Sequence, residues 1–129
     1  MMFEQIILGH LVADYLLQPK KMAIAKSEKG IKGFAWCAAH CLIYTAIICL
    51  FALTFNPIII VLIFLSHFPI DRWSLASKWL KMIRGRDFVK TYESKPEYYE
   101  IDLSFSIMVY TIVDNTLHLL LLWTIFALI

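Results

Sequence analysis

The sequence predicts an all-α integral membrane protein, a four-helix bundle with a polar His/Asp site inside the bundle. Of the 129 residues, 60% are apolar, and the mean hydropathy of +0.71 lies well above the usual range of soluble domains. Long segments carry almost no charge, and all four histidines fall inside such segments. We therefore expect a single transmembrane domain, residues 1–129, whose main solvent is lipid.

The expected helices cover about residues 3–18, 34–55, 57–84 and 103–129. A membrane span needs roughly 20 apolar residues, so the second and fourth segments qualify by length. The first segment is short and is either a tilted span or a re-entrant helix, of which we favour the span. It does not resemble a signal peptide, because Glu4 takes the place of the basic region and no small-residue cleavage site follows.

Local signals mark the ends of these helices. Pro19 should end the first helix just before it, since a proline biases the preceding residue away from helix. Asn56 and Pro57 have the residue types of an N-cap and a first helical residue. The third helix should continue beyond the membrane as an interfacial stretch and end at Gly85. Residues 86–102 then form the aqueous loop.

The basic residues predict the topology. All twelve Lys and Arg residues lie in two stretches, 20–32 and 72–95. Four spans place both stretches on one side, which the positive-inside rule makes cytoplasmic, whereas three spans would separate them. We therefore expect both termini outside. The net charge of +2 is too small to predict a nucleic-acid partner, and the expected partner is membrane lipid.

The three cysteines lie in one expected helix, where free cysteine behaves as a small hydrophobic residue. Their odd number within one helix argues against a disulfide. Cys37 and Cys41 flank His40, so a metal-binding role stays open as the less favoured alternative.

Seven titratable side chains inside the expected helices carry the functional prediction. A carboxylate near the bilayer centre costs about 2.5–3.5 kcal/mol on insertion scales, so the three Asp residues should be paired or ligated. Three His/Asp pairs are four residues apart, which places each pair on one helix face. The reversed order in the last helix, which runs the opposite way, keeps the pairs at matching depth. The candidate metal ligands are His10, Asp14, His40, His67, Asp71, Asp114 and His118.

Imidazole nitrogens together with carboxylate oxygens suit Zn²⁺, or Fe or Mn at a more oxygen-rich site. Seven candidates exceed the four ligands of one structural zinc, which predicts one to three ions with some of the carboxylates orienting the imidazoles. Gln18, Asn115 and Thr116 are candidates for the outer shell. Pro69 removes a backbone donor between His67 and Asp71 and should kink the third helix.

The run from His10 to Pro19, then Ala39-His40, the run from His67 to Trp73, and Asp114-x-x-x-His118 resemble domain-of-unknown-function family 3307, which comprises small bacterial and phage membrane proteins. The resemblance covers nearly the whole chain and the order of its motifs. It implies a bacterial inner-membrane location and brings no established activity. The repeated His-x-x-x-Asp pairs are more distantly similar to membrane-bound metal-dependent hydrolases and to zinc-dependent phospholipases C. That similarity implies zinc at all seven positions, although this chain lacks the N-terminal Trp ligand of the secreted enzymes.

We therefore expect a membrane metal-dependent hydrolase that acts on a lipid or lipid-linked phosphoester through metal-activated water. No residue stands out as a separate general base; Asp71 or Asp114 would serve if it is not a ligand. One alternative is a metal or proton transporter, since intramembrane His/Asp chains also mark ion pathways, and four helices would then require a homo-oligomer. Another is a non-catalytic scaffold or phage lysis component, whose polar pairs only join helices at about 0.6 kcal/mol each.

Overall fold

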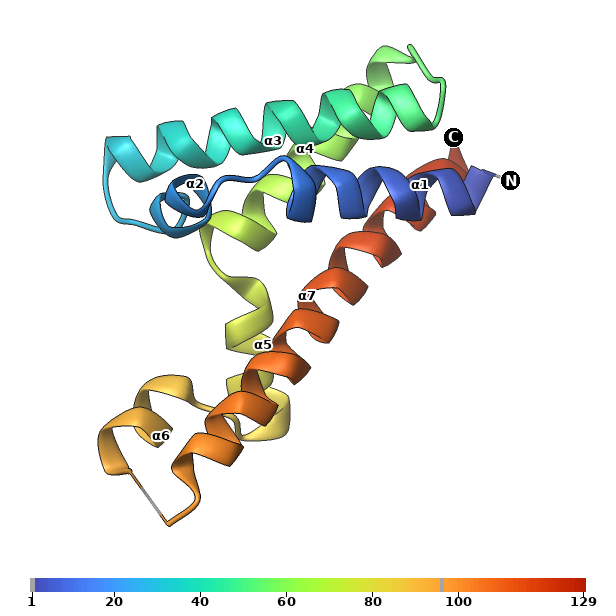
Figure 1. The fold of residues 1–129 in the computed structure, drawn as a ribbon. Coiled ribbons are helices and arrows are strands. Elements are labelled where there is room, and N and C mark those ends of the chain that lie inside the picture. The colour runs from blue at the N-terminus through green and yellow to red at the C-terminus, as the bar shows by residue number, and fades with distance from the viewer. Residues whose placement is uncertain (1, 96) are drawn as a thin grey trace.

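The computed structural model describes residues 2–95 and 97–129, and this part of the chain is helical with no strand (Figure 1). The prediction of an all-α protein is confirmed. The elements in chain order are α1 (Met2–Leu11), the π-helical turn η1 (Val12–Leu16), α2 (Lys20–Ala25), α3 (Ile31–Phe51), α4 (Pro57–Arg72), α5 (Leu75–Arg84), α6 (Phe88–Ser94) and α7 (Tyr99–Leu128).

Helices α1, α3 and α4 lie side by side, and α7 crosses them obliquely (Figure 1). Helix α3 contacts both α1 and α4, while α7 contacts α1, α4, α5 and α6. The beginning of α1 and the end of α7 meet, because Phe3 and Ile6 share a pocket with Trp123 and Phe126. The two ends of the chain therefore lie at the same end of the molecule (Figure 1).

One cluster of buried apolar side chains joins the four longest segments. Its members come from α1 and η1, from α3, from α4 and from the second half of α7. They are Ile6, Ala13, Tyr44, Ile48, Ile59, Ile63, Leu122 and Ile125. The side chains on the outward faces of these helices are also largely apolar, and many of them are exposed. Such a surface is typical of helices surrounded by lipid.

The described part of the chain contains two helices of membrane length and one bent pair that reaches this length only if the pair is a single span. Helices α3 and α7 are each long and apolar enough to cross a membrane, while α4 and α5 meet that condition only as a bent pair. At about 1.5 Å per residue, the 30 residues of α7 extend about 45 Å, which exceeds the roughly 30 Å hydrocarbon core. The segment formed by α1 and η1 is shorter than such a span.

The first helix ends earlier than expected and in a different geometry. It passes into η1, in which Leu17 N–H donates to the carbonyl oxygen of Val12 over 3.0 Å, five residues back. The chain is already non-helical before Pro19, whose extended backbone precedes α2. The wider π-helical turn carries Asp14, and such turns occur frequently at functional sites.

The expected helix over 57–84 is divided into α4 and α5, whose axes differ by 60°. Its start is as expected, because the Asn56 side chain accepts a 2.9 Å hydrogen bond from Ile58 N–H and Pro57 is the first helical residue. The kink expected at Pro69 stays a prediction. Helix α4 continues through that proline, and the chain turns at Ser74, whose left-handed backbone (φ 47°) ends the helix.

The basic connection expected over residues 20–33 is partly ordered as α2, which packs on α3. Gly33 makes this approach possible. A Cβ atom there would lie 1.9 Å from the carbonyl oxygen of Glu28, so any other residue would push the α2–α3 connection away. The turn places Lys26 against the end of α4.

Residues 86–102 were expected to be an aqueous loop, and much of this segment is helical. Helix α6 packs on α7, and α7 begins at Tyr99 instead of residue 103. Glu100 and Asp102 lie in the first turn of α7, where negative charge favours helix formation. Arg86 joins the segment to α7 through a 2.7 Å hydrogen bond to the Ser106 hydroxyl.

Candidate metal centre

Six of the seven predicted ligands come together in one buried cluster, which we call the His/Asp cluster. His10 comes from α1, Asp14 from η1, His40 from α3, His67 and Asp71 from α4, and His118 from α7. Each of the four histidines is at most 2% exposed. His10 and His118 are 108 positions apart in the chain, and the packing of the helices brings them into one polar interior.

The middle of the cluster is formed by His40, His67, Asp71 and Asp14. The Nε2 atoms of His40 and His67 lie 3.0 Å apart, and both lie 3.2 Å from Asp71 Oδ2. Asp14 Oδ1 lies 3.2 Å from His40 Nε2 and 3.9 Å from His67 Nε2. Ligands at about 2.0–2.1 Å from a tetrahedral zinc are separated by about 3.3 Å, so these spacings fit a shared metal ion.

His118 presents a lone pair to this cluster. Its Nδ1–H donates to the backbone carbonyl oxygen of Asp114 over 2.9 Å, which leaves Nε2 of the neutral ring as an acceptor. Nε2 is buried without a hydrogen-bond partner and lies 3.9 Å from another acceptor, Asp71 Oδ1. Two acceptors that face each other in a buried space require a proton or a cation between them.

His10 has a related arrangement, and its ring lies beside that of His118 with centroids 5.6 Å apart. Asn115 donates through Nδ2 to Tyr15 and to the Thr111 carbonyl, so its Oδ1 accepts from His10 Nε2–H over 2.7 Å. The Nδ1 atom of the neutral ring is then an acceptor, and the Tyr44 hydroxyl donates a 2.9 Å hydrogen bond to it. Asp14 Oδ2, also an acceptor, lies only 3.3 Å from this nitrogen.

Lys26 supplies a positive charge that the sequence analysis assigned only to topology. Its Nζ donates to Asp71 Oδ2 over 2.7 Å, and the two side chains are 17% and 4% exposed. A buried carboxylate without a positive partner is costly, so this pair stabilises Asp71 in its charged form. Residue spacing does not predict this pair, because it depends on how the short helix α2, which ends just before Lys26, folds back against α4.

Asp114 is the predicted ligand that stays at the margin. Its Oδ2 lies 3.7 Å from His118 Nδ1, a nitrogen that already donates to the Asp114 backbone, and its side chain is 23% exposed. The predicted pairing with His118 is therefore close in space. The carboxylate lines a pocket beside the His/Asp cluster and shares no contact with its middle among the described residues.

Two further side chains complete the cluster. Tyr44 is buried, and its ring stacks on His67 with centroids 3.7 Å apart. Cys41 lies near His67 and Asp71, and these three form one of two groups whose ligand atoms are all within 4.8 Å of one another. The other group is Asp14, His40 and His67. All three cysteines are free, as expected.

The fold and this cluster define a class: an all-helical protein with membrane-length helices and a buried group of His and Asp side chains. The chain belongs to the family described as "Protein of unknown function (DUF3307)", which matches residues 2–129. The predicted family resemblance is confirmed over essentially the whole chain. No curated protein and no solved structure matches the chain.

Proposed function

We propose that the protein is an integral membrane hydrolase that uses a divalent metal, zinc by its ligand types, to cleave a lipid or lipid-linked phosphoester. The zinc ligands would be His40, His67, Asp14 and Asp71 in the middle of the His/Asp cluster, with His118 and His10 as neighbouring ligands. Imidazole and carboxylate ligands suit zinc, and the surplus of ligands accommodates one to three ions.

The main observation behind this proposal is that acceptor atoms face each other inside the cluster, above all His118 Nε2 and Asp71 Oδ1. His118 Nε2 is buried without a hydrogen-bond partner 3.9 Å from the acceptor Asp71 Oδ1, and Asp14 Oδ1 is buried without one 3.2 Å from His40 Nε2. Buried polar atoms are nearly always satisfied, so an arrangement of this kind indicates a missing positive partner. Lys26 supplies such a positive partner only to Asp71 Oδ2.

A membrane setting is supported by the layout of the helices. We propose four crossings, formed by α1 with η1, by α3, by α4 and by α7, with both termini outside the bacterial inner membrane. The meeting of the two chain ends is consistent with an even number of crossings. The 60° bend before α5 would turn its apolar side along the membrane interface while Lys78 and Lys81 face the headgroups.

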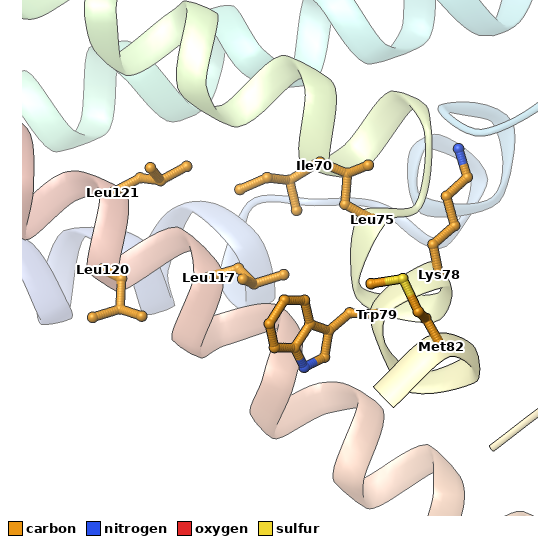
Figure 2. A pocket seen from close by; sticks show the side chains of 8 residues that line it. All are labelled: Ile70, Leu75, Lys78, Trp79, Met82, Leu117, Leu120 and Leu121. Atoms are coloured by element: carbon orange, nitrogen blue, oxygen red, sulfur yellow. The ribbon is translucent and has the colours of Figure 1, made fainter. Parts of the chain in front are cut away.

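A lipid substrate is supported by a groove beside the cluster. The groove encloses about 450 Å³ and is lined by apolar side chains of α4, α5 and α7 (Figure 2). Ile70 and Leu117 in its wall are the sequence neighbours of Asp71 and His118. Lys78 lies at its margin, where its ammonium group would lie at the membrane interface while a hydrocarbon chain occupies the groove (Figure 2).

In the proposed reaction a water oxygen bonds to phosphorus, one ester P–O bond breaks, and the departing oxygen receives the proton that the water loses. A bound metal would lower the pKa of that water to about 7 and polarise a phosphoryl oxygen. The residues of the chain would hold the ligand geometry and exclude bulk water. Asp114, at the margin of the cluster, would take this proton from the water and pass it to the departing oxygen.

The test uses the full-length protein purified in detergent. Metal content is measured by elemental mass spectrometry, and phosphoester cleavage is followed with defined phospholipids before and after chelation. We expect at least one zinc per chain and cleavage that stops on chelation and returns with zinc. Stoichiometric absence of metal after growth in zinc-replete medium would contradict the proposal, and zinc flux into liposomes without cleavage would favour the transporter.

A further inference from the structure

A second pocket of about 250 Å³ lies beside the His/Asp cluster and differs in chemistry from the apolar groove. Its wall includes Asp14, Tyr15, Gln18, Lys26 and Asp114, which come from η1, the segment after it, the end of α2 and α7. We call it the polar pocket. The three larger grooves on the molecule are lined almost entirely by apolar side chains, so this concentration of polar groups is distinctive.

The polar pocket is connected to the cluster by shared and bonded residues. Asp14 belongs to both, and Lys26 reaches from the pocket wall to Asp71. Tyr15 in the wall accepts from Asn115, which in turn accepts from His10. A molecule in the pocket would therefore lie next to the atoms that we assign to the metal.

Two groups in the wall define the ligand chemistry. The Gln18 side-chain nitrogen is buried and has no hydrogen-bond partner, so the pocket offers a donor that requires an acceptor. Asp114 offers a carboxylate, which accepts hydrogen bonds or attracts positive charge. A ligand that satisfies both must donate and accept at closely spaced atoms.

Three common kinds of headgroup differ in this respect. A phosphate satisfies Gln18 and is attracted by Lys26, but it is repelled by both Asp14 and Asp114. An ammonium satisfies Asp114, offers Gln18 no acceptor and meets the charge of Lys26. A pair of hydroxyl groups donates to the Asp114 carboxylate and accepts from the Gln18 amide without any like-charge contact, so it satisfies both of these groups.

We propose that the polar pocket binds the hydroxyl-bearing headgroup of the lipid phosphoester while the phosphate lies at the His/Asp cluster. This assignment rests on the proposed function and adds the substrate class to it. Drug-sized ligands occupy pockets of about 300–1,000 Å³, so a pocket of about 250 Å³ is suited to a headgroup and not to a whole lipid. The ring edges of Tyr15 and Tyr110 can cover the carbon side of a polyol.

The experiment compares three lipids with identical acyl chains: phosphatidylglycerol, whose headgroup has two hydroxyls, phosphatidylethanolamine and phosphatidate. Binding is measured as the rise in unfolding temperature of the zinc-loaded protein, and cleavage as the appearance of the lipid product by mass spectrometry. The variants are Gln18→Leu and, as a control of the same residue type in α1 that does not line the pocket, Gln5→Leu.

We expect phosphatidylglycerol to bind and to be cleaved about tenfold better than the other two, and Gln18→Leu to remove that preference while Gln5→Leu keeps it. Equal cleavage of all three lipids would overturn the pocket assignment and leave the hydrolase standing. A preference for phosphatidylglycerol in binding that Gln18→Leu abolishes, without cleavage of any lipid, would support the pocket and contradict the hydrolase. Folding of each variant is checked by its unfolding temperature without lipid.

Discussion

His118 Nε2 points its lone pair at Asp71 Oδ1 across 3.9 Å, and neither atom has a proton to share in the neutral state of the imidazole. This pair of atoms, one from α7 and one from α4, has opposite effects on the stability of the protein with and without metal. In the metal-free protein it is a cost, because a buried acceptor has no partner. With a metal between the two atoms it becomes a pair of ligands.

The variant His118→Leu tests this directly. In metal-free protein the change should leave stability unchanged or raise it by about 1 kcal/mol, because a buried unsatisfied nitrogen is removed. In zinc-loaded protein the same change should lower stability, because a ligand is lost. Thermal unfolding with and without zinc measures both values, and Thr124→Val on the exposed face of α7 is the control. The same sign of effect under both conditions would contradict a role of His118 as a ligand.

Zinc should stabilise the wild-type protein strongly. A ligand that binds only the folded state at 100 times its dissociation constant adds about 2.7 kcal/mol of stability. Chelation should therefore lower the unfolding temperature, and zinc should restore it while magnesium, which prefers oxygen ligands, should not. The affinity for zinc should also fall as the pH is lowered, because His and Asp bind metal in their deprotonated forms. Calorimetry at several pH values measures this dependence.

Replacement of Lys26 tests its pairing with Asp71. Lys26→Met leaves the mostly buried carboxylate without its 2.7 Å partner, which should cost about 1.5–3 kcal/mol in metal-free protein. Bound zinc can take over the charge of Asp71, so the stabilisation by zinc should be larger in the variant than in the wild type. Lys29→Met, at an exposed site of the same connection, is the matched control. Equal gains from zinc in all three proteins would show that Lys26 and the metal do not share Asp71.

Tyr44→Phe separates the two contacts of that side chain. The substitution keeps the ring that stacks on His67 and removes the hydroxyl that bonds to His10 Nδ1. A loss of about 1 kcal/mol is expected from the missing hydrogen bond. Because His10 Nδ1 is then free to bind metal, zinc affinity should be retained or increased. Titration with a competing chelator measures that affinity, and a large fall in it would place the hydroxyl itself at the metal.

Gly33→Ala tests the turn that brings α2 and Lys26 to the cluster. The new methyl group would meet the Glu28 carbonyl oxygen at 1.9 Å, so the connection must shift, at a cost of about 1–3 kcal/mol. Lys32→Ala, at the preceding position, lacks this clash and should be nearly neutral. If the shift carries Lys26 away from Asp71, a double variant with Lys26→Met should lose less stability than the sum of the single variants. Additive losses would show that the turn does not position Lys26.

The sequence alone was sufficient for the all-α fold, for the start of α4 at Asn56-Pro57 and for the family. It also indicated which His and Asp residues share a helix face, since this depends only on a spacing of four residues within one helix. Local geometry of this kind depends only on residues that are close together in the chain. The seven residues were therefore visible as a set before any contact between helices was known.

The tertiary structure decided which atoms meet. Residue spacing does not specify how far each helix is rotated or shifted against the next one, because those quantities depend on packing between residues that are distant in the chain. Packing placed six of the predicted side chains in contact, left Asp114 at the margin, and added Tyr44 from the apolar core. The return of α2 brought Lys26 to Asp71, and the left-handed backbone at Ser74 set the direction of α5. These features arise from steric fit and charge pairing between separate helices. The periodicity of residues within one helix does not predict them.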